Sequence, residues 1–172
     1  QSETVWHQAD RYHIPRLAYI NKIDRIGADY ERVVQMIHER LNPNAVPVNI
    51  PLGKEEDLEG IVDLISMKLW TFDPLTQGGV MHLEEIPEKH MAEVREKRNA
   101  LLEAVAEYDD ELMMKYLEGE ELPEELIRRA IRKGTIHHGF IPVLCGSSLK
   151  NKGVQLLLDA ICDYLPSPLE VQ

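Results

Sequence analysis

The sequence is poor in cysteine, in long apolar runs and in positive charge, and each shortage excludes a class of protein. Its two cysteines, Cys145 and Cys162, lie in apolar stretches without metal-type spacing, so we expect buried free thiols in a reducing compartment, the cytoplasm. No apolar run approaches the length that crosses a bilayer and no signal peptide is visible, so we expect no membrane partner. The net charge of −11 argues against a nucleic-acid phosphate binder, which would carry a basic stripe.

The composition is that of a folded protein. Of the 172 residues, 44% are hydrophobic and 28% are charged, and the length suits one domain. The chain begins at Gln1 with a helix-like segment and stops after a helix and the proline-containing residues 165–168. We therefore expect a piece of a longer protein, with 169–172 as the start of a linker.

The first part of the chain predicts a strand, a loop and a helix. Residues 2–12 show helical spacing with Ser2 as a candidate cap, and the apolar run Leu17–Ile20 is typical of a buried parallel strand. A polar loop follows at Asn21–Gly27, and then an amphipathic helix at Tyr30–Leu41.

The last part repeats this order. Phe140–Cys145 predicts a second buried strand, Gly146–Gly153 a polar loop and Val154–Leu165 an amphipathic helix. Two such units predict a doubly wound α/β fold with a parallel sheet built from residues 17–21 and 142–145.

The middle of the chain differs from both ends. It predicts three strand-like segments and then helices, with a possible break at Asp109-Asp110, and 15 of the 30 acidic residues lie in 84–125. We interpret 44–133 as an α+β insert in an α/β core made of 1–43 and 134–168. The strand-like segments are 46–52, 60–72 and 80–86, and the helices are 88–117 and 123–133.

The motif that carries chemistry is N-K-x-D at Asn21–Asp24. Guanine presents two donors side by side, its ring N1–H and its amino group, and the carboxylate of Asp24 can accept both. Lys22 can lay its apolar stem on the base, and Asn21 can brace neighbouring loops. The motif follows the end of a predicted strand, where open α/β sheets bind ligands.

The loop after the second strand strengthens this interpretation. A tight loop at Cys145–Lys150 can offer a backbone N–H to the guanine O6 carbonyl. Within it, Ser147 could hold Asp24 and Leu149 could cover the other face of the base. Alone, the loop is typical of an ordinary strand-to-helix turn.

The phosphate-binding half of a nucleotide site is missing from this sequence. Gly53-Lys54 lacks the surrounding G-x-x-x-x-G-K-[ST] pattern, and D-x-x-G at Asp57–Gly60 follows N-K-x-D instead of preceding it. The His137-His138 pair has no further ligands nearby, so we expect no metal site.

Several segments together carry a resemblance to a known family, and they are Gln1–Trp6, Asn21–Asp29, Lys115–Leu117 with Gly119–Glu121, and Gly146–Pro168. Through them the whole chain resembles bacterial-type translation elongation factor G, and the insert resembles that family's extra subdomain. The resemblance implies a GTP-driven ribosomal translocase, with GTP or GDP bound through Asn21, Lys22 and Asp24 and through the second base loop, Ser147, Ser148 and Leu149. Many relatives carry Ala at position 148, where the implied contact is a backbone N–H.

The resemblance also implies what is absent and what is bound. The P-loop, the switches, the Mg²⁺ ligands and the catalytic histidine lie upstream in the family, so we expect this chain alone to be inactive. Residues 44–133 would meet the stalk of the large ribosomal subunit. With two core strands, the isolated chain would expose a sheet edge and self-associate or be marginally stable.

Two other functions are compatible with the sequence. The first is a ribosomal-protection or release-factor type of translational GTPase. The second is a non-enzymatic acidic interaction module in which N-K-x-D is incidental.

Overall fold

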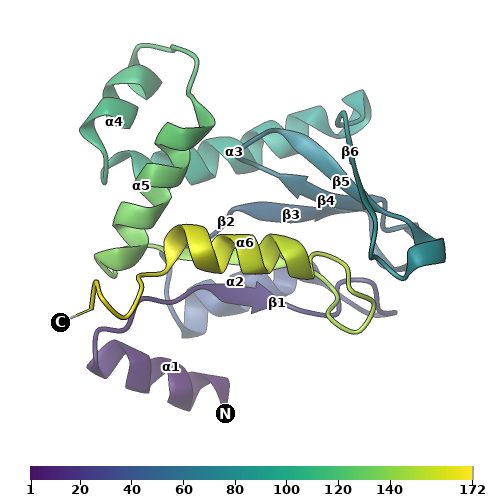
Figure 1. Cartoon of the computed structure of the whole chain (residues 1–172), viewed down its shortest axis with the longest axis horizontal. Coiled ribbons are helices and arrows are strands. Elements are labelled where there is room, and N and C mark those ends of the chain that lie inside the picture. Colours follow the sequence, from purple (N-terminus) through teal and green to yellow (C-terminus); the bar gives the residue numbers. More distant parts are fainter. Residues whose placement is uncertain (172) are drawn as a thin grey trace.

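The computed structural model describes residues 1–171 and combines two sheets with six α-helices over that range (Figure 1). The elements are α1 (Ser2–Arg11), β1 (Ala18–Ile20), α2 (Tyr30–Arg40), β2 (Ala45–Pro47), β3 (Asn49–Leu52), β4 (Gly60–Asp63), β5 (Lys68–Phe72), β6 (Met81–Glu84), α3 (Met91–Ala106), α4 (Asp110–Leu117), α5 (Glu124–Ile136), β7 (Ile141–Cys145) and α6 (Val154–Tyr164), with short 3₁₀ turns η1 (Glu55–Asp57), η2 (Pro74–Thr76) and η3 (Glu88–His90).

The first sheet is parallel and has the order β1-β7-β2. The predicted α/β fold is confirmed, but the expectation of two core strands is wrong, because residues 45–47 pair with β7 as a third strand. The chain leaves this sheet at Val48, whose N–H still donates to Val143 O at 2.9 Å, and β3 then pairs with β4 instead. The predicted boundary of the insert at residue 44 stays a prediction. Residues 45–47, which follow it, form β2 and belong to the parallel sheet.

Helices cover both faces of the parallel sheet. All five residues of β7 are buried, and neighbours along it point to opposite faces. Val143 packs in a cluster with Val34 of α2, whereas Leu144 packs with Ala160 and Tyr164 of α6. Figure 1 shows α6 in front of the sheet and α2 behind it. Because β1 and β7 run in the same direction, the loops that follow them leave the same edge of the sheet.

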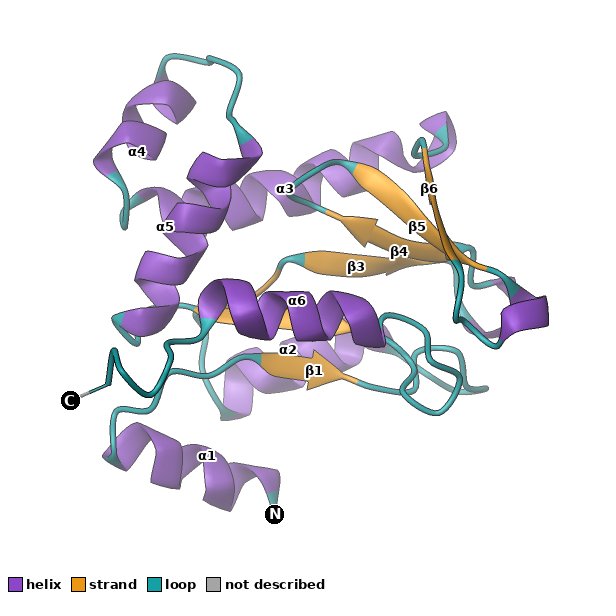
Figure 2. Ribbon diagram, viewed as in Figure 1, coloured by secondary structure: helices purple, strands orange, loops and turns teal. Residues whose placement is uncertain are grey.

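The second sheet is antiparallel, with the order β3-β4-β5-β6, and Figure 2 shows α3 behind it, whereas α5 packs against α3, α6 and β7. The expected break in the long acidic helix is confirmed between α3 and α4. Asp109 causes it, because its carboxylate accepts from the N–H groups of Glu111 and Leu112 and so starts a new helix. Arg129 and Lys133 of α5 also donate to Asp109, at 2.8 and 2.9 Å.

Two local predictions are wrong. Ser2 is already inside α1, and Gln1 occupies the capping position without a side-chain hydrogen bond. Cys145 is buried, and burial raises the pKa of its thiol well above the ordinary value, but Cys162 of α6 is exposed. Among the helices of the described residues, none has the length and apolar character needed to cross a membrane.

Candidate functional site

The two predicted loops lie side by side at the carboxyl edge of the parallel sheet. Gly146 N–H donates to Ile20 O at 3.0 Å, which extends the pairing of β1 with β7 by one residue. Ile23 N–H in turn donates to Gly146 O at 3.3 Å. The sheet thus brings Asn21–Asp24 and Ser147–Leu149 together, although more than a hundred residues separate them in the chain.

Asn21 ties the two loops together through its side chain. Its Nδ2 donates to Ser148 Oγ at 2.9 Å, and its Oδ1 accepts from the backbone N–H of Ser148 at 2.9 Å. Oδ1 also accepts from Lys22 N–H at 2.8 Å, and Lys22 is in the left-handed region with φ of 63°. An asparagine supplies both the acceptor and the donor that this bridge needs, which an aspartate could not do.

Asp24 is a buried carboxylate with unused acceptor capacity. The residue is 8% exposed, and its Oδ2 has no hydrogen-bond partner within the part of the chain that the structure describes. Lys150 Nζ lies 3.2 Å from Oδ2, so the contact is an ion pair that is not aligned as a hydrogen bond. Burial would raise the pKa of Asp24, but the Ser147 hydroxyl and the Lys150 ammonium together hold it below the ordinary value.

These features leave the Asp24 carboxylate able to accept hydrogen bonds from a ligand. It is ionised at neutral pH, it is partly removed from water, and it stays short of the hydrogen bonds that a buried carboxylate normally makes. A ligand that presents a pair of N–H donors would satisfy it. Lys150 would then have to move aside or slide along the ligand, and with 62% of its side chain exposed it has room to do so.

The remaining predicted residues frame this acceptor. Lys22 is exposed and Leu149 is 82% exposed, so both have apolar surface available for a flat ring. Ser147 is buried, and its backbone pairs with Lys152 in both directions at 2.7 and 2.8 Å, which closes the loop. The family resemblance implies that the Ser148 N–H donates to guanine O6, but in this structure it donates to Asn21 Oδ1. The N–H groups of Leu149 and Lys150 have no acceptor among residues 1–171.

Sequence reasoning missed two residues of this site. One is Lys150, which is the cation that faces Asp24, and its position three residues after Ser147 is the sequence signal for this role. The other residue is Gly146. A Cβ on Gly146 would lie 2.2 Å from Tyr19 Oη and 2.4 Å from Lys152 O, so only glycine allows this loop to close.

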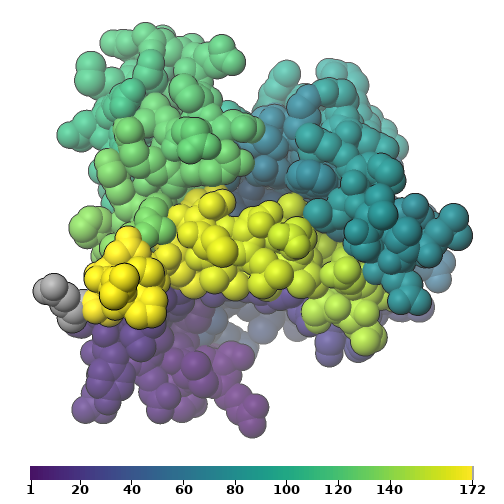
Figure 3. Space-filling view, viewed as in Figure 1, coloured from purple at the N-terminus to yellow at the C-terminus, as the bar shows by residue number. Residues whose placement is uncertain are grey.

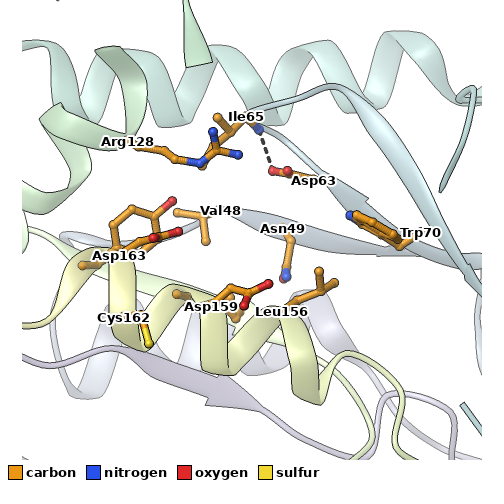
Figure 4. A pocket seen from close by; sticks show the side chains of 13 residues that line it. Val48, Asn49, Asp63, Ile65, Trp70, Arg128, Leu156, Asp159, Cys162 and Asp163 are labelled. Atoms are coloured by element: carbon orange, nitrogen blue, oxygen red, sulfur yellow. Dashed lines mark hydrogen bonds between the residues drawn. The ribbon is translucent and has the colours of Figure 1, made fainter. Parts of the chain in front are cut away.

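Two hollows near or beside this site are not lined by Asp24. One, of about 310 Å³, lies between the first loop and the start of α2, and Asn21, Lys22 and Ile23 help to line it. The other, of about 290 Å³, lies between α6 and the antiparallel sheet (Figure 4). In the second, Asp63 already accepts from Ile65 N–H and Ser66 Oγ, both at 2.9 Å, so this carboxylate is satisfied by its own turn. The two loops at the sheet edge are therefore the candidate site.

Comparison with known proteins identifies the family of this chain. The chain is similar to a crystal structure of a protein from Thermus thermophilus, with a TM-score of 0.83 and 30% sequence identity. The similarity covers 98% of this chain and 24% of that chain. Residues 1–167 match the family described as the elongation factor Tu GTP binding domain. The chain therefore belongs to the elongation factor Tu GTP-binding domain family, whose members bind guanine nucleotides.

Proposed function

We propose that this chain is the guanine-recognition part of a translational GTPase of the elongation factor G type, which drives translocation on the ribosome. The observation that carries the proposal is the buried Oδ2 of Asp24, which faces Lys150 but has no hydrogen-bond partner among residues 1–171, at the point where Asn21 joins two strand-end loops. Guanine N1–H and its amino group would both donate to this carboxylate. Adenine would place an acceptor nitrogen there, and a site built on a specific hydrogen-bond pattern can reject such a base by roughly 10⁴-fold.

We further propose that the phosphate-binding parts of the GTPase come from a longer polypeptide. The sequence has no G-x-x-x-x-G-K-[ST] segment, and phosphoryl transfer depends mainly on positioning the phosphates and Mg²⁺. Among residues 1–171, no group of three or more His, Cys, Asp or Glu side chains could hold a metal ion. In this proposal Asp24 selects the base and contributes nothing to hydrolysis, so this chain alone does not hydrolyse GTP.

The antiparallel sheet with α3 to α5 is the proposed contact with the large-subunit stalk of the ribosome. On α4, Met114 is 61% exposed and Leu117 is 74% exposed, which offers apolar contact on an otherwise acidic segment. Apolar docking suits this partner better than charge attraction, because residues 84–125 hold 15 of the 30 acidic residues and the stalk protein is itself acidic. Replacing Met114 and Leu117 together with Glu should abolish binding to isolated stalk protein without changing nucleotide affinity.

The test of the main proposal is base selectivity in the longer protein. Fluorescent GDP should bind at least a thousandfold more tightly than the matching ADP analogue, and unlabelled GTP should displace it. Equal affinity for both analogues, or no binding of either, would favour the interaction-module alternative. Ribosomes should stimulate GTP hydrolysis by the longer protein, and a translocase should also move peptidyl-tRNA in the same assay. Hydrolysis without movement of peptidyl-tRNA would indicate a protection or release factor instead.

A further inference from the structure

The antiparallel sheet reaches the second candidate loop through the turn that contains η2. Gly78 in this turn is buried and has φ of 78°. A Cβ placed on Gly78 would lie 2.4 Å from Asn151 O and 2.8 Å from Lys150 O. The turn therefore rests directly on the backbone that follows Leu149, and Figure 3 shows the two segments in contact.

The same sheet reaches the first candidate loop through η1. Glu55 Oε1 accepts from Gly27 N–H at 2.9 Å, three residues after Asp24. Glu55 has φ of 52°, in the left-handed region that residues with a side chain rarely adopt. Because no other acceptor for Gly27 N–H exists within the described chain, this carboxylate fixes the end of the N-K-x-D loop.

A third contact lies beneath both loops. Ile61 of β4 is fully buried in one apolar cluster with Ile23, the variable residue of N-K-x-D. A Cβ on Gly153, where the second loop ends, would lie 2.7 Å from Ile61 Cδ1. The antiparallel sheet thus supports both loops from below and holds each of them at one edge.

We propose that Glu55 and Gly78 are positioning residues for the two guanine loops, and that the antiparallel sheet thereby sets the rate of guanine-nucleotide release. This inference rests on the proposed function, because it concerns the same loops. Displacing the η2 turn moves the Lys150–Asn151 backbone and with it the Ser147–Leu149 loop. Displacing η1 frees Gly27 and the end of the Asn21–Asp24 loop.

The first test is Gly78→Ala in the longer protein, with Gly119→Ala as the matched control. Gly119 has φ of 68°, but no atom lies within 4 Å of the position that its Cβ would take, so its variant carries the same backbone strain without a contact. Gly78→Ala should speed GDP release about tenfold, the effect of losing one hydrogen bond, while Gly119→Ala stays within about twofold of wild type. Release of inosine diphosphate should accelerate by the same factor, because it shares the O6 that this loop faces.

The second test is Glu55→Ala, with its exposed neighbour Glu56→Ala as the control. Loss of one backbone hydrogen bond should likewise speed release about tenfold for Glu55→Ala and leave the control unchanged. Hydrogen exchange gives a readout without nucleotide. Gly78→Ala should raise exchange at the Ser147 and Lys152 amides, which pair with each other's carbonyls, whereas Gly119→Ala should not.

The outcomes separate the two claims. If wild-type protein prefers GDP to ADP but Gly78→Ala matches Gly119→Ala in release and in exchange, the positioning role is wrong and the proposed function stands. If wild-type protein shows no preference for guanine, the proposed function fails and this inference fails with it. Equal melting temperatures for the two glycine variants, with faster release only for Gly78→Ala, would establish positioning over general destabilisation.

Discussion

Replacing Asp24 with Asn in the longer protein should move the base preference from guanine toward xanthine. Asn keeps one acceptor, but it turns an NH₂ group toward the guanine amino group, so one charge-assisted bond is lost and a donor meets a donor. Hydrogen bonds to charged groups contribute about 1.5–3 kcal/mol each, so the loss of one should lower GDP affinity by about 10- to 10²-fold. Xanthine has a carbonyl where guanine has its amino group, and this carbonyl accepts from the new NH₂.

Folding should not obscure this result. The pKa of Asp24 lies below its ordinary value, so the wild-type carboxylate is charged throughout the neutral range. Its ion pair with Lys150 involves a side chain that is 62% exposed, and losing such a pair costs at most about 1 kcal/mol.

Competition titrations of GDP and xanthosine diphosphate at pH 7 measure the switch. Asp29→Asn is the matched control, since it removes the same charge five residues away and an Asn can still cap α2. An unchanged preference for GDP in the Asp24 variant would refute the role assigned to this carboxylate.

Three further predictions follow from other contacts. Asn21→Ala removes both hydrogen bonds to Ser148 and should weaken GDP binding by about ten- to thirtyfold in fluorescence titrations of the longer protein, while affinity for isolated stalk protein stays unchanged. Asp109→Ala should lower the free energy of unfolding by about 2 kcal/mol in urea at pH 7, because it removes the cap of α4 and the acceptor that Lys133 and Arg129 share, although Arg129 keeps its ion pair with Glu111. Hydrogen bonds from those cations hold the pKa of Asp109 far below its ordinary value, so its contribution is complete above about pH 4 and is lost as pH falls further; a difference between variant and wild type that did not shrink below pH 4 would contradict this. Gly134→Ala should destabilise the fold by about 1 kcal/mol although alanine favours helix, because its Cβ would lie 2.8 Å from the Tyr108 ring; a higher melting temperature would show that α5 can shift.

The elements that carry the site were predictable from the sequence. Apolar runs bounded by proline and polar residues identified β1 and β7, and helical spacing identified α2 and α6. These two strand–loop–helix units place both loops at one edge of the sheet. The position of the two loops next to each other therefore follows from topology alone. The break at Asp109 was also predictable, because aspartate in front of an acidic first turn favours a helix start.

What the sequence could not supply was the partner of each segment. Residues 46–52 form one apolar run, and no periodicity shows that β2 pairs with β7 while β3 pairs with β4. The prediction that Asn21 braces a neighbouring loop did not identify Ser148, because the contact depends on the register of β1 with β7. The roles of Glu55 and Gly78 were not predictable for the same reason, since each acts through a contact between distant segments.

The bridge between Asn21 and Ser148 joins residues 127 positions apart, and this separation has a consequence for folding kinetics. Pairing of β1 with β7 must close about three quarters of the chain into a loop, and such non-local contacts slow folding. The intervening segment leaves the parallel sheet after β2 and returns at β7, where Ala45 and Ile141 are neighbours. If that segment folds first, the chain that remains to be closed is short. Closure entropy grows only with the logarithm of loop length. The length of the intervening segment can therefore change greatly while the two guanine loops still meet.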